Sequence, residues 1–360
     1  MKLLNCYAIA YTIALNLVCL LVPGFANVTG EPPTSKTIFQ SFESEEVINM
    51  EMIFDMDTLL ANKMKNVYQF ATVTIDSDFG LITQEIKVKA RGRSRRTYCE
   101  FPPLKLKFPK EGLQQIGLNK RHNSLKLVTH CAEDANSQKN VLEEYLAYKL
   151  YNELTDASYK VQLVKVTYTH ARTGESMKRF GIVLEDTDEM AERIGGKEDE
   201  TMGMPKKQYQ KEALNLLSVF QYMVGNEDWR PEFLRNIKHV QLPTGEMIPV
   251  PYDFDAAGIV NANYAKPDRD LRLETVLQRQ FMGTFANKKE RQKTIDFVQS
   301  KKEVLLKTID TLPYMDAVSK KVASRYIHSF YDIIENRSKL NRAMPLKGRT
   351  PEATDVWGAM

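Results

Sequence analysis

The order of hydrophobic patterns along the chain limits its fold more than any other feature. Alternating apolar and polar residues, typical of strands, recur from residue 47 to 185 and are interrupted by a prominent helical pattern over 140–154. Helical spacing dominates later, beginning with a largely apolar stretch over 212–224. The sequence therefore predicts an α+β protein with a β-rich N-terminal lobe over 45–186 and a mainly helical C-terminal lobe over 187–345.

The first 26 residues have the pattern of a secretory signal peptide. Lys2 precedes an apolar run from Tyr7 to Val22, and a small-residue cleavage sequence ends at Ala26. An uncleaved membrane anchor is the alternative, but the run is shorter than the ~20 apolar residues of a comfortable span, and Asn16 interrupts it. We expect cleavage, no membrane span in the mature protein, and a secreted, periplasmic or cell-surface location.

The composition is that of an ordinary globular protein, with 43% hydrophobic and 27% charged residues. The formal net charge of +4 falls to +3 when Lys2 leaves with the signal peptide, which is too small to indicate nucleic-acid binding. A polar, proline-containing segment over 27–44 predicts a linker, and residues 346–360 are expected to form a flexible tail.

Two cysteines, Cys99 and Cys131, lie beyond the signal peptide. In an oxidising compartment they could form one disulfide, which requires Cα atoms within about 7 Å. Two separate buried thiols are the alternative. Neither cysteine has metal-ligand spacing and the five histidines do not cluster, so a zinc site is not expected.

The acidic residues around a predicted hairpin over 225–258 could bind a metal ion. Asp228 and Asn236 bracket the loop of "GNEDWRP", while Asp253 and Asp255 end the strand of "PVPYDFDAAG". Carboxylate and amide oxygens are the ligands that a hard cation such as Mg²⁺ prefers, with phosphates completing its shell. In the alternative interpretation, Asp228 caps a turn and Asp255 caps a helix.

A basic segment precedes this hairpin in the chain. The run "KARGRSRRTYCEFPPLKLKF" includes Arg91, Lys105 and Lys107, whose side chains suit phosphate contacts. Glu143 or Glu144, on the predicted helix that follows, could hold a strand lysine in place, as a helix glutamate does in protein kinases. A solvated basic loop and an exposed pair of glutamates are the alternatives.

The ordered set of these segments resembles the CotH kinase family, which is named for a spore coat protein, and in particular its secreted bacterial branch. The motifs that carry the resemblance, from about residue 45 to 340, are "RGRSRRTYCEFPPLKLKF", "LKLVTH", "NVLEEYLAYKLYNEL", "GIVLED", "GNEDW" and "PVPYDFDAAG". The resemblance implies an atypical protein-kinase-like fold of two lobes, with ATP and Mg²⁺ between them, and phosphoryl transfer to a hydroxyl group of a protein.

The resemblance also implies roles for individual residues. Lys105 would bind phosphate, with Lys107 as the alternate and Glu143 or Glu144 as its partner, and Arg91 would add a phosphate contact. Asp228 would orient the attacking hydroxyl group and accept its proton. Asn236 would bind the metal together with Asp253, the principal ligand, and Asp255.

The sequence departs from the ordinary kinase pattern in several places. It has no G-x-G-x-x-G loop and no H-R-D triplet, "DFD" stands where D-F-G is usual, and eight positions separate Asp228 from Asn236, more than in the usual catalytic loop. One alternative is therefore a catalytically degenerate kinase-fold protein of the envelope or surface that binds a partner through residues 89–107. Another is a hydrolase that uses Glu227, Asp228 and the two acids of "DFD" as paired carboxylates.

Overall fold

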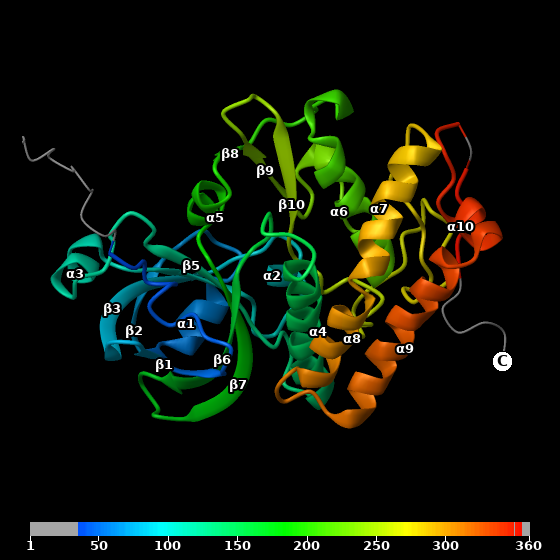
Figure 1. Ribbon diagram of the computed structural model, residues 1–360. Helices are drawn as coiled ribbons and strands as arrows, with labels where there is room; N and C mark the ends of the chain where they lie inside the picture. Colours follow the sequence, from blue (N-terminus) through cyan, green and yellow to red (C-terminus); the bar gives the residue numbers. More distant parts are fainter. Residues whose placement is uncertain (1–34, 349, 355–360) are drawn as a thin grey trace, which may run out of the picture. The chain divides into compact units, whose positions relative to one another are not determined.

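The computed structural model describes residues 35–348 and 350–354, so the expected signal peptide lies outside the described residues (Figure 1). Its strands are β1 (Ile48–Phe54), β2 (Gln69–Ser77), β3 (Gly80–Ala90), β4 (Leu104–Lys107), β5 (Ser124–Val128), β6 (Val161–His170), β7 (Ser176–Leu184), β8 (Lys197–Asp199), β9 (Ile237–Gln241) and β10 (Met247–Pro251). Its helices are α1 (Met56–Ala61), α2 (Arg95–Tyr98), α3 (Lys110–Gln115), α4 (Ala135–Asn152), α5 (Thr187–Arg193), α6 (Lys211–Val224), α7 (Lys288–Ser300), α8 (Lys302–Thr311), α9 (Ala317–Ile334) and α10 (Arg337–Ala343), with short 3₁₀ helices at Lys206–Gln208 and Pro231–Phe233.

The N-terminal part is a closed barrel in the order β1-β2-β3-β4-β5-β7-β6. Neighbouring strands are antiparallel except β1 and β6, which close the barrel by parallel pairing from Ile48 opposite Val164 to Phe54 opposite His170. Alternate residues point inward, as the sequence pattern predicts for half-buried strands. The predicted α+β class is confirmed, with a sheet-rich N-terminal part and helices in the C-terminal part.

The barrel core extends into the segment that was expected to be a linker. Ile38, Phe39 and Phe42 are fully buried and pack against the inward residues of the barrel. The hydroxyl group of Thr37 donates a hydrogen bond of 2.6 Å to Oε1 of Glu189 on α5. Residues 37–42 are therefore part of the folded barrel.

Helix α4 lies between the barrel and the C-terminal helices (Figure 1). It contacts β6 and β7 on one side and α8 on the other. Its N-terminus is capped by Asp134, whose side chain accepts a hydrogen bond from the backbone N–H of Ser137. Most of its side chains are buried, including the polar Asn140, Glu143 and Glu144, so packing on several sides fixes the rotation of the helix about its axis.

The C-terminal part combines a small antiparallel sheet, in the order β10-β9-β8, with helices α6 to α10 around a second core. Part of the expected flexible tail joins this core, because Thr354 exchanges backbone hydrogen bonds with the fully buried Arg279. In the part of the chain that the structure describes, the helices are all too short or too polar to cross a membrane.

Candidate active site

Arg95 is the centre of a buried cluster of charges. Its Nη2 donates hydrogen bonds of 2.8 Å to Oε2 of Glu144 and to Oδ1 of Asp253, and its Nε donates one of 2.8 Å to Oδ2 of Asp255. The planar guanidinium group suits such shared contacts with carboxylates. Because three carboxylates share one cation, the cluster keeps a formal excess of negative charge.

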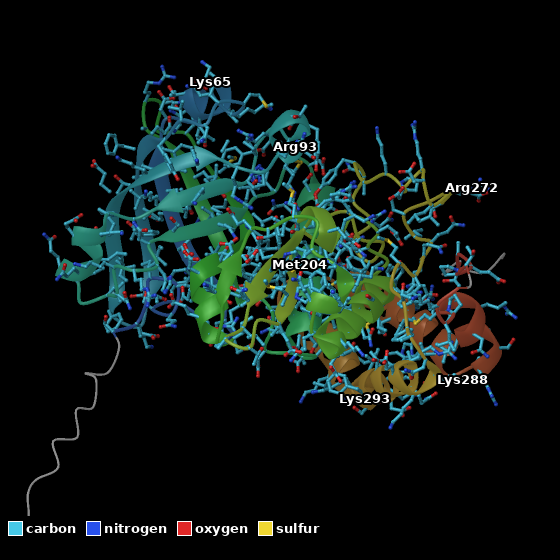
Figure 2. The ribbon with its side chains drawn as sticks, turned by 90° about the horizontal axis from the view of Figure 1, so that it is seen from above. Lys65, Arg93, Met204, Arg272, Lys288 and Lys293 are labelled. Atoms are coloured by element: carbon cyan, nitrogen blue, oxygen red, sulfur yellow. A yellow bond between two sulfur atoms is a disulfide. The ribbon has the colours of Figure 1, made fainter. Side chains whose placement is uncertain are left out.

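The cluster joins segments that are far apart in the sequence. Arg95 begins the short helix α2, Glu144 lies on α4, and the two aspartates follow β10. Arg93, only two residues before Arg95, is exposed (Figure 2). Because the basic run contains several arginines in succession, its letters alone do not distinguish the buried one, and the sequence analysis missed Arg95.

A disulfide between Cys99 and Cys131 fixes the segment that carries Arg95. The two Cα atoms lie 4.6 Å apart, and the backbone N–H of Cys99 donates to the carbonyl group of Arg95. Cys131 precedes α4 by only four residues. The disulfide thus connects the end of α2 to the start of the helix that carries Glu144, and it resolves the alternative that the sequence left open.

Burial shapes the protonation of this cluster. It raises the pKa of Glu144 to about 8, although Arg95 opposes the shift, and it also raises the pKa of Asp253. Burial alone would lower the pKa of Arg95, but Asp253, Asp255 and Glu144 together raise it well above its usual value. The guanidinium group therefore stays charged and is the fixed counter-ion of the site.

The two aspartates differ in access to solvent. The side chain of Asp253 is 35% exposed, whereas that of Asp255 is 8% exposed. Asp253 has a left-handed backbone with φ of 66°, and its N–H donates a hydrogen bond of 2.8 Å to Oη of Tyr148 on α4. Asp255 instead accepts from Arg95 and lies 3.4 Å from Oη of Tyr98. Asp253 is thus the aspartate of the pair that an incoming ligand can reach.

Two glycines bring the loop of Asp228 beside these aspartates. The N–H of Gly258 donates to the carbonyl group of Gly225, with a distance of 2.8 Å. A Cβ atom at Gly225 would lie 2.0 Å from Oη of Tyr326, and one at Gly258 would lie 2.2 Å from the same atom. Only glycine fits such a close approach, so the motifs "GNEDW" and "DFDAAG" meet at their glycines.

Asp228 and Asn236 contact each other directly. Nδ2 of Asn236 donates to Oδ2 of Asp228 at 2.9 Å and to its backbone carbonyl at 2.7 Å, and Arg235 forms an ion pair with the same carboxylate. Burial raises the pKa of Asp228, with Arg235 opposing and the charge of Asp255 adding to the rise. Asp228, Asn236, Asp253 and Asp255 therefore lie in one electrostatic environment.

Lysines form a row on the outer face of the barrel. Lys89, Lys105 and Lys126 lie opposite one another on β3, β4 and β5, and Lys107 lies opposite Lys87. Lys105 is half-buried and Lys107 is exposed. The register places Lys105 between Lys89 and Lys126. Glu144 forms its ion pair with Arg95, and not with Lys105 or Lys107 as the resemblance implies.

Lys126 is the second residue that the sequence analysis missed. Its Nζ lies 2.5 Å from Oγ1 of Thr187 and 3.2 Å from Oη of Tyr159, and the rings of Tyr159 and Tyr252 are 4.8 Å and 5.7 Å away. Burial, with a smaller contribution from the charge of Arg91, lowers the pKa of Lys126 to about 7. In the sequence, "SLKLV" shows only an ordinary strand with one lysine on its polar face.

Arg91 lies within electrostatic reach of both halves of the site. Its positive charge lowers the pKa of Lys126 on the barrel and the pKa of Asp253 after β10. The backbone N–H of Arg91 donates to the carbonyl group of Pro103 at 2.7 Å, which fixes its position beside β4. Cations of the barrel and acids of the C-terminal part are therefore within electrostatic range of one another.

Glu143 points away from Arg95. Its Oε1 lies 3.5 Å from Nζ of Lys139, one helical turn earlier on α4, and the side chain lines a separate cavity. Burial raises the pKa of Glu143 to about 7. Of the adjacent glutamates, only Glu144 belongs to the Arg95 cluster.

The Arg95 cluster has the donor types that a magnesium ion requires. Its acids outnumber Arg95, and among the described residues Oε1 of Glu144 is buried without a hydrogen-bond partner. Asp253 offers the accessible carboxylate, and Asn236 adds an amide oxygen close to Asp228. These oxygen donors fit a hard divalent cation that also contacts phosphate.

A second group of acids, Asp55 and Asp57 with His170, is less suited to a metal. Arg172 forms ion pairs with both carboxylates. The backbone N–H of Arg172 donates to Nδ1 of His170, so the proton of the neutral ring lies on Nε2, the atom that faces the acids. A metal bound through Nε2 would need the ring proton on Nδ1, where the N–H of Arg172 already donates, so the group is a poor metal site although Nε2 has no hydrogen-bond partner among the described residues.

No family model matches the sequence, and no curated protein matches it. Among solved structures, the crystal structure of a Helicobacter pylori proinflammatory kinase, CtkA, is 12% identical with a TM-score of 0.38. The alignment covers 66% of this chain and 94% of that chain. Similarity of this size does not establish a shared fold, so the functional conclusion below rests on the residues of the site.

Proposed function

We propose that this protein is an atypical protein-kinase-like phosphotransferase that uses ATP and Mg²⁺ to phosphorylate a hydroxyl group of a protein. The observation that carries the proposal is that cations of the barrel side lie close to acids of the C-terminal part. Arg95, between β3 and β4, donates to Asp253 at 2.8 Å, and Nζ of Lys126 on β5 lies 5.7 Å from the ring of Tyr252, the residue before Asp253. Such an arrangement suits a ligand that has anionic phosphates at one end and a bound divalent cation.

In this proposal the barrel side holds the nucleotide phosphates. Lys126 and Arg91 supply positive charge, Lys105 lies beside Lys126 on the same face, and the exposed Lys107 is the outermost contact. Glu144 orients Arg95 and does not hold a lysine, because its carboxylate receives the hydrogen bond from Nη2. Arg95 in turn fixes the carboxylates of Asp253 and Asp255 before the ligand arrives.

The acids of the C-terminal part carry the chemistry. Asp253, Asn236 and Asp255 would hold Mg²⁺, which when bound would neutralise the charge of the phosphates. Asp228 accepts the proton of the substrate hydroxyl group, whose oxygen bonds to the γ-phosphorus while the bond to the bridging oxygen breaks and ADP leaves. Burial raises the pKa of Asp228, which makes it a stronger proton acceptor than an exposed aspartate.

Secretion is part of the same proposal. The expected signal peptide predicts an oxidising compartment, and the disulfide between Cys99 and Cys131 is of the kind that persists there. The partner is then a protein substrate of the envelope or the surroundings of the cell.

A catalytically degenerate kinase-fold surface protein is the second candidate, and one observation favours it. Arg95 already contacts both Asp253 and Asp255, so a metal has to share these carboxylates with a guanidinium group. The hydrolase alternative has less support, because Glu227 accepts a hydrogen bond from the N–H of Gln280, while Asp253 and Asp255 are bound by Arg95 and Asp228 by Arg235.

Calorimetric titration of the protein with Mg²⁺-ATP tests the proposal. We expect one saturable site and transfer of labelled γ-phosphate to the protein itself or to an added protein mixture. Asp253→Asn should weaken Mg²⁺-ATP binding, and Asp228→Asn should abolish transfer while retaining binding.

The control is Asp332→Asn, at an exposed residue of α9, which should leave binding and transfer unchanged. If well-folded protein binds no Mg²⁺-ATP, the phosphotransferase is excluded. Binding without transfer would instead support the degenerate alternative.

A further inference from the structure

A polar cavity of about 300 Å³ lies beside α4, away from the side chain of Glu144. It is formed by α4, by the segment 258–263 that follows the aspartates, and by α9. Polar and apolar side chains both line it, and its size is at the lower end of the range for small-molecule sites. The phosphotransfer proposed above does not use this cavity.

Two buried side chains in the wall of the cavity have unused hydrogen-bonding atoms. Asn140 is 7% exposed and Glu143 is 3% exposed. Among the described residues, neither Nδ2 of Asn140 nor Oε2 of Glu143 has a hydrogen-bond partner. The two residues are three positions apart on α4 and so lie on the same face of the helix. A buried donor and a buried acceptor thus lie on neighbouring residues of the cavity wall, at a cost that a ligand could offset.

The charges and atom types of the wall indicate what such a ligand is. Glu143 forms an ion pair with Lys139, with 3.5 Å between Oε1 and Nζ, so the pair is formally neutral. The remaining polar side chains of the lining are amides, from Asn136, Asn261 and Asn263, together with Tyr326. Apolar wall comes from Ile259, Val260, Leu277 and Val322. A hydroxyl group can accept from the amide of Asn140 and donate to the carboxylate of Glu143.

We propose that this cavity binds a small, neutral, polyhydroxylated molecule, such as a monosaccharide or a cyclic polyol. Its hydroxyl groups contact Asn140, Glu143 and the other asparagines, and its C–H groups contact the apolar wall. An anion would meet the unpaired oxygen of Glu143, and a metal ion would compete with Lys139 for the same carboxylate. A neutral ligand with several hydroxyl groups uses both unpartnered atoms and brings no charge into the cavity.

The cavity shares two elements with the Arg95 cluster. Glu144 follows Glu143 on α4, and the lining residue Gly258 comes three positions after Asp255. A bound molecule would therefore contact the segments that hold Glu144 and Asp255 in place. Binding itself does not depend on phosphotransfer, so the two proposals can fail separately.

Calorimetry of the folded protein with glucose, galactose, mannose and myo-inositol tests the inference, with glycine and inorganic phosphate as charged probes. We expect one of the four polyhydroxylated probes to bind at a single site, and Asn140→Ala and Glu143→Gln each to weaken that binding at least tenfold. Hydrogen exchange should slow in residues 136–146 when that probe is present. The matched control is Glu303→Gln, an exposed glutamate of α8 whose replacement should leave binding unchanged.

Three results would overturn the inference. The first is no saturable binding of any polyhydroxylated probe to folded protein. The second is binding that both Asn140→Ala and Glu143→Gln leave unchanged, because the probe would then occupy another site. The third is selective binding of glycine or phosphate, which would show that the cavity takes a charged ligand. Circular dichroism of each variant checks the fold, and the conservative Glu143→Gln keeps the test valid if Asn140→Ala unfolds the chain.

Discussion

Nη2 of Arg95 lies 2.8 Å from Oδ1 of Asp253 and joins the barrel to the C-terminal acids. This contact connects residues that are 158 positions apart in the chain. The same nitrogen also donates to Glu144. The buried guanidinium group therefore fixes the position of Glu144 on α4 relative to Asp253 after β10.

Arg95→Met should lower the free energy of unfolding by about 3–5 kcal/mol at pH 7, because it removes the buried cation that Asp253, Asp255 and Glu144 share. Urea denaturation measures the change. The exposed Arg93 provides the control, since Arg93→Met should change the stability by no more than about 0.5 kcal/mol. Equal effects of the two substitutions would contradict the central role of Arg95.

Replacing both Cys99 and Cys131 by serine should lower the free energy of unfolding by about 3 kcal/mol, because the disulfide restricts the unfolded chain. Denaturation with and without dithiothreitol gives an internal control. The reductant should destabilise the natural protein and leave the double variant unchanged. A natural protein that is insensitive to full reduction would show that the disulfide contributes no stability.

Gly225→Ala should be far more damaging than Gly245→Ala. Both glycines have positive φ, at 66° and 85°, but a Cβ atom at Gly225 would meet Oη of Tyr326 at 2.0 Å, whereas one at Gly245 would meet nothing within 4 Å. We expect Gly245→Ala to cost about 1–2 kcal/mol from backbone strain alone and Gly225→Ala to cost several kcal/mol more.

A double substitution identifies the cause of the Gly225 effect. Tyr326→Phe removes the hydroxyl group that the new methyl group would meet, so it should recover part of the stability lost in Gly225→Ala. Melting temperatures of the two single variants and the double variant measure the coupling. Strictly additive losses would mean that the hydroxyl group is not the obstacle.

Glu227→Gln should remove part of the pH dependence of stability. Burial raises the pKa of Glu227 from its ordinary value of 4.5 to about 8. Between these values the folded protein keeps a proton that the unfolded chain releases, so stability falls as the pH rises from about 4.5 to about 8. One such group contributes at most about 1.4 kcal/mol per pH unit.

Urea unfolding at pH 5, 6.5 and 8 measures this effect as the difference between the variant and the natural protein. The glutamine keeps an oxygen that can accept from the N–H of Gln280, so the comparison isolates the proton. The exposed Glu303 is the control, and Glu303→Gln should retain the natural slope. An unchanged slope in Glu227→Gln would contradict the raised pKa.

The acylation rate of Lys126 by an amine-reactive reagent should level off above about pH 8, because an amine with a pKa of about 7 is then almost fully neutral. Mass spectrometry of proteolytic peptides measures the rate at each pH. A rate that keeps rising about tenfold per pH unit up to pH 9 would contradict the lowered pKa. Slower labelling in the presence of Mg²⁺-ATP would place the nucleotide next to Lys126.

The sequence predicted most strands and helices because their patterns are local. The alternation of Leu104 and Leu106 with lysines is visible within β4, and the apolar residues of α6 are visible within that helix. The short strand β8 was not predicted. The closure of the barrel could not be predicted in this way. The parallel pairing of β1 with β6 depends on contacts between distant segments, for which a single sequence contains no local signal.

The site was predicted unevenly for the same reason. Asp228, Asn236, Asp253 and Asp255 could be proposed from the sequence because they lie in two short motifs with acids beside apolar residues. Arg95 was missed because its burial depends on the position of α2, which the disulfide fixes from outside the motif.

The parallel pair that closes the barrel also determines when folding can finish. One edge of β1 pairs with β2 early in synthesis. Its other edge stays unpaired until β6, which lies far later in the chain, has been synthesised. Until then, the backbone of Ile48–Phe54 presents unpaired hydrogen-bonding groups that can pair with another chain. The nascent protein therefore has a period of vulnerability to aggregation that ends only when Leu184 has emerged, because β7 completes the ring of strands between β5 and β6.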